Sequence, residues 1–554
     1  MTKSVSPCVA DSFGFPLVET LPTHERITSP IVSAIIPAES CCSTPGSLCT
    51  NYVGALTHAL SQHFDRLRKV TMSALSLFLP VALLLFCSSI PAMPQMLASQ
   101  ATQAPNPSIR DFEGKYQYRD GLTLFMVSSG DQLAAIIGDS KYRLSPVGKD
   151  NFKNPAGDQI PFVRDSSGRI MAFKEGGVEF PRLSPNVPDE ARALLSPRPG
   201  GAAGKPEDYK YTPPPLLSDG ISVGKAGSTT LSSEVAEQLV NGVLQQKYAD
   251  VHSLLVYHKG FLVLEEYFYG FNREKPHPMI SLTKSVISLL AGAAVDRGMV
   301  PADEPVLSRL GYPTLQNPDP RKAKVTLTHL LSNQSGLACN EYDRSSPGNE
   351  AHLFETADWA KAFVDLPMVS EPGTVARYCS GGFFTTGRIV ERVSGKPLPQ
   401  FADQVLFTPL GIPGSNWRWS FALNRSDRNT FGQIYLRPRD MLKLGILIQN
   451  RGLWQHERVI SSSWIDAATG FQSRIDDSDY GLGIWHRWYS VKTTSGESRV
   501  DTVMLSGNGG QKVYLVPSLD LIVVSTGDAF FVESPLNEMM VQVLLPALMT
   551  KDRK

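Results

Sequence analysis

Two residues near the middle of the chain have types and a spacing that suit nucleophilic catalysis. Ser281 and Lys284 stand three positions apart at the start of an apolar run that continues to Val295. Positions i and i+3 of a helix share one face, so the serine hydroxyl and the lysine ammonium can meet. In the first turn, free backbone N–H groups and the helix dipole favour developing negative charge. The pattern predicts a serine nucleophile activated by a lysine.

The chain contains a second pair with the same spacing. Ser222 and Lys225 lie in a Pro- and Gly-rich stretch with no helical pattern after them. Residues 220–224 also match the G-x-S-x-G turn of α/β-hydrolases, but that motif needs a core strand before it and a helix after it. The flanking sequence has neither, so we predict that Ser281 is the nucleophile.

A lysine has an unperturbed pKa of about 10.4 and is a poor base at neutral pH. A serine–lysine site therefore needs a second acid/base and backbone donors for the oxyanion. Tyr378 and Ser380 stand two apart in a loop bounded by Pro and Gly, so both side chains could point the same way. A second loop, at the entry to a strand, has glycines that allow close backbone approach to a ligand. It contains Asn508, Gly509, Gly510 and Gln511.

Together these motifs resemble those of serine β-lactamase-like hydrolases. Ser281-x-x-Lys284, Tyr378-x-Ser380 and Asn508-Gly509-Gly510 follow the order and approximate spacing of the family's three motifs. The resemblance covers roughly 229–549 and is closest to the class C β-lactamase and D-alanyl-D-alanine carboxypeptidase group, with its esterase and 6-aminohexanoate-dimer hydrolase relatives. Further segments that resemble the family are 325–337, 409–412, 439–441 and 480–483.

The resemblance implies an acyl-enzyme hydrolase that uses no metal or other cofactor and acts on a small-molecule ester or amide. Ser281 would attack the carbonyl, and Lys284 would accept or relay its proton. Tyr378 would be the second acid/base. Backbone N–H groups of Ser281 and Gln511 would form the oxyanion hole, and Ser380 would complete the polar network.

Two positions depart from the β-lactamase pattern. Ser380 stands where those enzymes carry Asn, and neutral Asn508 stands where they carry Lys, or His in some relatives. A lysine offers positive charge to a substrate carboxylate, whereas Asn offers only hydrogen bonds. We therefore expect cleavage of an ester or linear amide rather than efficient β-lactam hydrolysis. A β-lactamase or penicillin-binding D,D-peptidase or sensor, and a non-catalytic membrane-anchored surface module, stay open as alternatives.

The elements that position these motifs indicate an α/β catalytic domain over 229–549. Strand patterns occur at both ends of this range, so they can form one antiparallel sheet flanked by helices, with a helical lobe over roughly 300–480. This is a β-lactamase/penicillin-binding-protein-like fold. The expected strands are 253–257, 261–269, 500–505, 512–516 and 521–525, and the flanking helices are 231–246, with a Ser cap, and 536–549.

A small all-β domain is expected before the catalytic domain. Residues 108–183 show alternating apolar runs with Gly, Asp and Ser turns about every 8–12 residues, which predicts a barrel or sandwich. No candidate catalytic groups cluster there, so we interpret it as an accessory domain. Residues 184–228 are rich in Pro and Gly and are expected to form a linker.

Residues 1–101 are expected to be disordered apart from a signal or anchor segment at about 66–93. A basic flank at 66–69 precedes an apolar run at 72–86, as in an export signal. If the run is not cleaved, it would anchor the chain in a membrane. Either reading places the catalytic domain in the periplasm or outside the cell.

The balance of charges and the placement of the cysteines bear on the partners and the disulfide bonding of the chain. The 53 basic and 53 acidic residues balance, so we expect no nucleic-acid partner. Cys339 and Cys379 are the two cysteines of the exported body, and we predict that they lie close enough for a disulfide, with two buried thiols as the alternative.

We also expect Asp440 to cap a helix running to Gln449, and His329 to cap or pack rather than catalyse. The sequence contains no signal for the oligomeric state.

Overall fold

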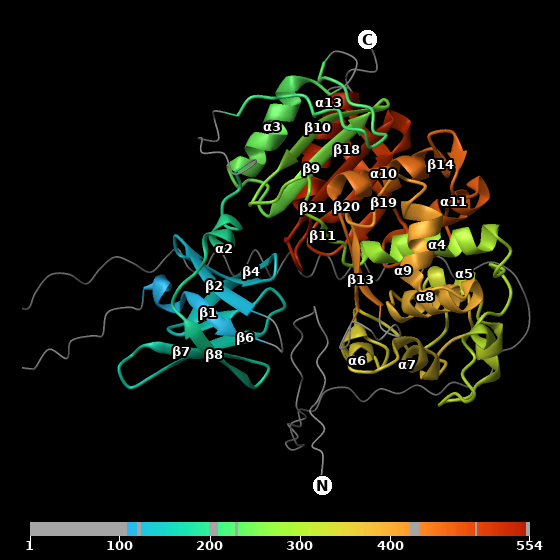
Figure 1. Cartoon of the computed structure of the whole chain (residues 1–554), viewed down its shortest axis with the longest axis horizontal. Coiled ribbons are helices and arrows are strands. Elements are labelled where there is room, and N and C mark those ends of the chain that lie inside the picture. The colour runs from blue at the N-terminus through green and yellow to red at the C-terminus, as the bar shows by residue number, and fades with distance from the viewer. Residues whose placement is uncertain are drawn as a thin grey trace, which may run out of the picture. The chain divides into compact units, whose positions relative to one another are not determined.

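The computed structural model (Figure 1) describes residues 108–118, 123–198, 209–227, 231–421, 431–493 and 496–549. The predicted signal or anchor segment at 66–93 lies outside these residues, so the structure does not test it. Within the described ranges, no helix is long and apolar enough to cross a membrane.

The small domain is a closed eight-stranded barrel, which confirms the barrel rather than the sandwich alternative. Each strand pairs antiparallel with the next, and β1 closes the barrel against β8. Aromatic side chains fill the interior, as in the contact between the Phe112 and Phe152 rings, whose centroids lie 5.0 Å apart. The elements are η1 (Ile109–Phe112), β1 (Gly114–Gln117), β2 (Thr123–Ser129), β3 (Gln132–Ile137), β4 (Ser140–Gly148), β5 (Asn151–Lys153), β6 (Gln159–Arg164), β7 (Ile170–Glu175) and β8 (Val178–Ser184).

The range expected to be a linker is attached to its neighbours at several points where the structure describes it. It contains a short helix, α2 (Asp189–Ala193). Residues 209–227 run beside the catalytic sheet, where Val223 forms a parallel bridge with Leu262. Arg439 also reaches this segment and pairs with Asp219 at 2.6 Å. Pro and Gly content therefore predicted irregular backbone correctly, but not its attachment to the sheet.

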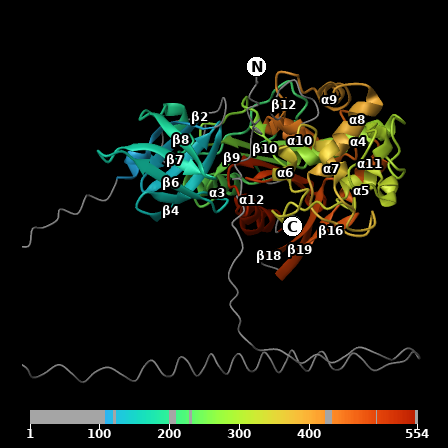
Figure 2. The same cartoon turned by 90° about the horizontal axis from the view of Figure 1, so that it is seen from below.

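The catalytic domain is built on an eight-stranded antiparallel sheet with the order β10-β9-β21-β20-β19-β18-β17-β16. Strands from the two ends of the domain meet where β9 pairs with β21, as predicted. Figure 2 shows the β18–β19 hairpin projecting from the rest of the sheet. The strands are β9 (Val251–His258), β10 (Phe261–Tyr267), β16 (Ser473–Ile475), β17 (Ser478–Tyr480), β18 (Trp485–Thr493), β19 (Gly496–Gly507), β20 (Gln511–Val516) and β21 (Leu521–Gly527).

Both faces of the central strands are buried, because their side chains alternate between two cores. Leu254 and Val256 pack with one set of helices, and Leu255 between them packs with the other set. The first set contains α3 (Ser233–Leu244), α12 (Pro535–Met539), η8 (Met540–Leu544) and α13 (Leu545–Met549), and the second contains α4 (Leu282–Asp296), α10 (Pro438–Gln449) and α11 (Ser462–Thr469). Figure 1 shows α3 and α10 beside the sheet. Ser232 caps α3, as expected.

The helical lobe fills most of the region between the two groups of strands, as predicted. Thr326 and His329 form a capping box at the start of α5, so His329 has the capping role expected of it. The elements are β11 (His277–Pro278), η4 (Leu307–Leu310), η5 (Pro320–Lys324), α5 (Leu327–Leu331), α6 (Glu350–Phe354), α7 (Trp359–Asp365), α8 (Gly381–Ser394), α9 (Leu398–Ala402), η6 (Asp403–Phe407), β12 (Arg418–Phe421), β13 (Phe431–Leu436), β14 (Leu453–Trp454) and β15 (Glu457–Arg458).

The expectation that Asp440 caps the helix ending at Gln449 was wrong. The helix begins at Pro438, and its N-cap residue, Arg437, makes no side-chain capping bond. Asp440 instead lies buried in the first turn, with Lys443 3.8 Å away. Burial raises the pKa of Asp440 to about 6 despite that lysine. Proline is favoured at the first helical position, because its fixed φ suits the helix and its missing N–H would have had no intrahelical partner, which explains the earlier start.

Candidate active site

The chain reaches Ser281 through a short strand and a sharp turn. After β11, Ile280 adopts a left-handed conformation with φ of 49°. A β-branched residue in this region costs on the order of 1–3 kcal/mol and is held there by its surroundings. The Ile280 N–H donates to Gln433 Oε1 at 3.2 Å, and α4 begins directly afterwards at Leu282. The turn therefore places Ser281 at the head of the helix.

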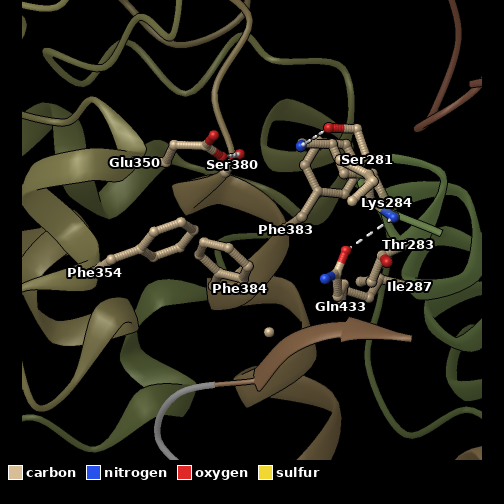
Figure 3. Close-up of a pocket in the computed structure, with 12 residues that line it drawn as sticks. Ser281, Thr283, Lys284, Ile287, Glu350, Phe354, Ser380, Phe383, Phe384 and Gln433 are labelled. Atoms are coloured by element: carbon tan, nitrogen blue, oxygen red, sulfur yellow. Dashed lines mark hydrogen bonds between the residues drawn. The ribbon is translucent and has the colours of Figure 1, made fainter. Parts of the chain in front are cut away.

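Ser281 is the N-cap residue of α4, but its hydroxyl makes no capping hydrogen bond. A serine at this position ordinarily accepts from a backbone N–H of the first turn. Here the Lys284 Nζ donates to Ser281 Oγ at 3.1 Å, and Lys284 is itself buried in the helix (Figure 3). The structure thus brings the two predicted residues together and leaves Ser281 Oγ free of any local structural bond.

Lys284 carries a proton at neutral pH. Burial lowers the pKa of Lys284, but Tyr378, Glu350 and Glu341 together outweigh burial, and the pKa is raised above its usual range. The ammonium lies 4.9 Å from the centroid of the Tyr378 ring. An ammonium donates hydrogen bonds and accepts none. The arrangement suits charge stabilisation and proton relay better than direct acceptance of the Ser281 proton.

Tyr378 belongs to an aromatic cluster in the loop before α8. Its ring stacks on Tyr342 with centroids 5.7 Å apart and planes 12° apart, and it contacts Trp485 at 5.5 Å. The loop is held through Asn333, whose Oδ1 accepts from the Cys379 N–H at 3.0 Å. Asn333 itself has a φ of 62° and is buried. Tyr378 is therefore fixed beside Lys284 by packing and by backbone hydrogen bonds.

Ser380 is the N-cap residue of α8 and, like Ser281, makes no capping bond. Its hydroxyl donates to Glu350 Oε2 at 2.9 Å, and its N–H donates to Glu341 Oε1 at 2.7 Å. The second oxygen of Glu341 accepts from the Glu350 N–H at 2.8 Å. Two carboxyl groups therefore hold Ser380 in place.

The carboxyl pair changes the electrostatics of the site. Burial and the neighbouring Glu350 raise the pKa of Glu341 to about 7, although Lys284 and backbone hydrogen bonds act in the opposite direction. A second carboxylate nearby disfavours ionisation of the first. Near neutral pH, the negative charge of the carboxyl pair beside Lys284 therefore depends on whether Glu341 is protonated.

The predicted third motif forms the turn between β19 and β20. Gly509 and Gly510 have φ of 84° and 96°, in the region that favours glycine. The Gln511 side chain closes the turn, because its Nε2 donates to Asn508 O at 3.1 Å and to Gly527 O at 2.7 Å. Asn508 is exposed at the tip.

Gly507 makes the close approach between this edge of the sheet and the turn before Ser281. A Cβ at Gly507 would lie 2.2 Å from Met279 O. In the register of the described strands, β18 pairs with β19 only up to Met504, so the end of β19 is free to face the turn. Gln511 begins the strand beyond β19 and pairs with Gly507. Among the predicted motif residues, Asn508 is thus the one that directly follows Gly507, at the end of β19 that approaches Met279 O.

A cavity opens beside Ser281 and extends into the helical lobe. Figure 3 shows Phe354 and Phe384 on the side away from Ser281 and Lys284, with Glu350 and Ser380 next to one another. The lining is mostly apolar and combines aromatic rings with a few polar groups. It consists of Ile280, Ser281, Thr283, Lys284, Ile287, Glu350, Phe354, Ser380, Phe383, Phe384, Gly432 and Gln433.

Cys339 and Cys379 form a disulfide with Cα atoms 5.7 Å apart. It connects the segment after α5 to the loop that carries Tyr378. Within the described residues, the one cluster of metal-type side chains consists of these cysteines and Glu341. Both sulfur atoms are used by the disulfide, so these residues do not offer a metal site.

Sequence reasoning missed Glu341, Glu350 and Gln433. Glu341 and Glu350 contact Ser380, and Gln433 contacts Ile280 in the turn before Ser281. Each stands far from its partner in the chain, outside any local pattern. Ser222, which shares the Ser281 spacing, is exposed in the segment beside β10, and the next described helix, α3, begins only at Ser233. The two serines therefore differ in structural context, as expected.

Comparison with known proteins identifies the family. The family model described as Beta-lactamase matches residues 236–527, more than half of the chain. The 6-aminohexanoate-dimer hydrolase of Paenarthrobacter ureafaciens is 24% identical over 294 residues, which cover 48% of this chain and 70% of that protein. Esterase EstB of Burkholderia gladioli is 30% identical over 143 residues, 24% of this chain and only 36% of the esterase. A solved family VIII carboxylesterase is 17% identical, with 58% of this chain and 99% of that chain covered and a TM-score of 0.44.

Proposed function

The chain belongs to the beta-lactamase family of serine hydrolases, and we propose that it cleaves an ester or a linear amide through an acyl-enzyme on Ser281. The observation that carries the proposal is the contact of 3.1 Å between Lys284 Nζ and an otherwise uncommitted Ser281 Oγ. A nucleophile is recognised by such a partner within hydrogen-bond reach.

In the proposed first step, Tyr378 acts as the base in its phenolate form: Ser281 Oγ attacks the substrate carbonyl carbon while the Ser281 proton passes to the Tyr378 oxygen, directly or through Lys284. The raised pKa of Lys284 favours relay, because the ammonium gives up one proton as it takes another. Tyr378 then protonates the leaving alcohol or amine, and the C–O or C–N bond breaks. Water attacks the resulting acyl ester, its proton returns through the same groups, and the acid product leaves with Ser281 restored.

The oxyanion formed in each half-reaction needs two backbone donors. The Ser281 N–H at the head of α4 is one proposed donor. For the other, the approach of Gly507 to Met279 favours the N–H of Asn508 over that of Gln511, the donor expected from the sequence. The Gln511 side chain would then act by holding the turn in shape.

The charges around Ser281 support a neutral substrate. Lys284 is already accompanied by Glu341 and Glu350, and the exposed Asn508 adds no positive charge. A substrate carboxylate would meet negative charge at this carboxyl pair, and like charges repel strongly where burial lowers the dielectric constant. The aromatic side of the cavity suits an apolar acyl or leaving group.

The test is a comparison of Ser281→Ala with Ser222→Ala, since Ser222 shares the Ser-x-x-Lys spacing. A fluorophosphonate probe should label the wild type and Ser222→Ala at equal rates and leave Ser281→Ala unlabelled. Hydrolysis of short p-nitrophenyl esters and linear amides should disappear in the same variant.

A chromogenic cephalosporin separates the proposal from its main alternative. Efficient cephalosporin turnover without ester or amide turnover would contradict the proposed substrate class. Stable penicillin labelling with no turnover of any substrate would indicate a penicillin-binding sensor. Failure of the wild type to react with every probe would exclude the acyl-enzyme itself.

A further inference from the structure

Buried polar groups connect the barrel to the strand that leads to Ser281. Lys141 on β4 is 2% exposed, and its Nζ lies 2.9 Å from Asp250 Oδ1 and 3.6 Å from Asp528 Oδ1. Its backbone N–H also donates to Asp528 Oδ2 at 3.0 Å. Both carboxylates belong to the catalytic domain, at the start of β9 and just after β21. Arg143, also on β4, adds a second positive charge, because its Nη2 lies 2.6 Å from Asp250 Oδ1. Two barrel cations therefore pair with the two buried carboxylates of the hydrolase domain.

The chain of contacts continues through two buried histidines. His252 Nε2 lies 3.2 Å from Asp528 Oδ2, and His252 Nδ1 lies 2.9 Å from His277 Nε2. His277 Nδ1 in turn lies 3.2 Å from Pro278 O. His277 and Pro278 form β11, three residues before Ser281. The contacts thus extend from the barrel to the turn that presents Ser281.

Asp528 takes a hydrogen bond from the barrel rather than from the histidines. Burial, followed by the neighbouring His252, holds the pKa of His277 well below its usual range. The His277 ring can then donate from Nδ1 to Pro278 O and accept at Nε2 from His252 Nδ1. Within the described residues, His252 Nε2 makes no hydrogen bond although it lies 3.2 Å from Asp528 Oδ2, whereas the Lys141 N–H does donate to that oxygen.

The barrel supports the other side of the site through the residues that follow Asp528. The Tyr142 ring stacks on Phe530 with centroids 5.0 Å apart and planes 13° apart. Phe530 occupies the space beside Gly509, where a Cβ would lie 2.6 Å from the ring. The N–H of Ala529 donates to Gly509 O at 3.1 Å. Residues 528–530 therefore brace the 508–510 turn and are held in place by the barrel.

We propose that the barrel is a positioning element of the hydrolase site, with Lys141 as its principal positioning residue. Lys141 fixes Asp528, and Asp528 in turn orders the His252–His277 pair that leads to Ser281 and the segment that braces the 508–510 turn. The proposal rests on the proposed function of Ser281. It assigns to the barrel a part in aligning the reacting groups, in addition to any support of the fold.

The test uses the full chain with Lys141→Met, which keeps most of the side-chain volume and removes the charge. The matched control is Lys174→Met, because Lys174 is an exposed barrel lysine paired with Glu179 at 3.4 Å. The rate constant of fluorophosphonate labelling should fall about tenfold or more in Lys141→Met, as for other misaligned sites. For a responsive ester, kcat should fall more than KM changes. Lys174→Met should match the wild type.

A double-mutant cycle separates positioning from a general loss of stability. If Lys141 acts through the histidine pair, adding His277→Gln to Lys141→Met should slow labelling by less than about threefold beyond the slower single variant. Combining Lys141→Met with His486→Gln, which alters a histidine paired with Asp501 on the β18–β19 hairpin, should give additive effects. Equal additivity in both cycles would overturn the proposed coupling.

Tyr142→Leu provides a second variant that leaves the buried charges paired, should Lys141→Met fail to fold. It removes the ring stacked on Phe530 and should also slow labelling while circular dichroism and the thermal midpoint show a folded protein. Wild-type labelling in the same assay establishes that Ser281 functions. The role of the barrel would be overturned if folded Lys141→Met and Tyr142→Leu were labelled at rates within about twofold of a reactive wild type. That result would leave the proposed hydrolase function intact.

Discussion

A methyl group added at Gly507 should separate the two halves of the proposed oxyanion hole. The Cβ of Gly507→Ala would lie 2.2 Å from Met279 O, whereas real Cβ atoms essentially never approach another atom within 3.0 Å. The end of β19 must therefore move by roughly 1 Å away from the turn before Ser281. Such a shift in a packed region costs about 1–3 kcal/mol of stability, and a misplacement of about 1 Å at a reacting centre can cost 10²-fold in rate.

Gly414→Ala is the matched control, since a Cβ at Gly414 meets nothing within 4 Å. Fluorophosphonate labelling and ester hydrolysis should fall about 10²-fold in Gly507→Ala and stay unchanged in Gly414→Ala. Thermal unfolding measures the accompanying loss of stability. Labelling of Gly507→Ala within about twofold of wild type would refute the reasoning that β19 contributes to the geometry at Ser281.

Two further predictions concern the segment between α5 and α8. The pKa of Glu341 is raised to about 7, so the folded state favours the protonated carboxyl. Glu341 should therefore stabilise the fold fully below pH 4.5, and this stabilisation, up to about 3 kcal/mol, should be lost as the pH rises through 7. Glu341→Gln should reduce this pH dependence in urea unfolding measured at pH 5 and pH 8, and unchanged curves would contradict the raised pKa. Replacing Cys339 and Cys379 by Ser should remove about 4 kcal/mol, since the disulfide closes a loop of 40 residues, and an unchanged urea midpoint under oxidising conditions would contradict this.

The sequence by itself predicted those features that depend on local spacing. Helical periodicity placed Lys284 on the same face as Ser281, and the structure has their side-chain atoms 3.1 Å apart. Alternating apolar runs predicted the barrel and the central strands of the sheet, because side-chain period follows directly from backbone geometry. The strands of β16–β18 were missed, since charged and aromatic residues interrupt the alternation there.

Only the tertiary structure decided which distant groups surround that serine–lysine pair. Glu341 and Glu350 contact Ser380 from 39 and 30 residues away in the chain, and Lys141 contacts Asp528 across 387 residues. No local periodicity predicts such contacts, because they depend on how the lobe and barrel pack against the sheet. Sequence spacing thus predicted the serine and its lysine, whereas packing set the charge beside Lys284 and the attachment of the site to the barrel.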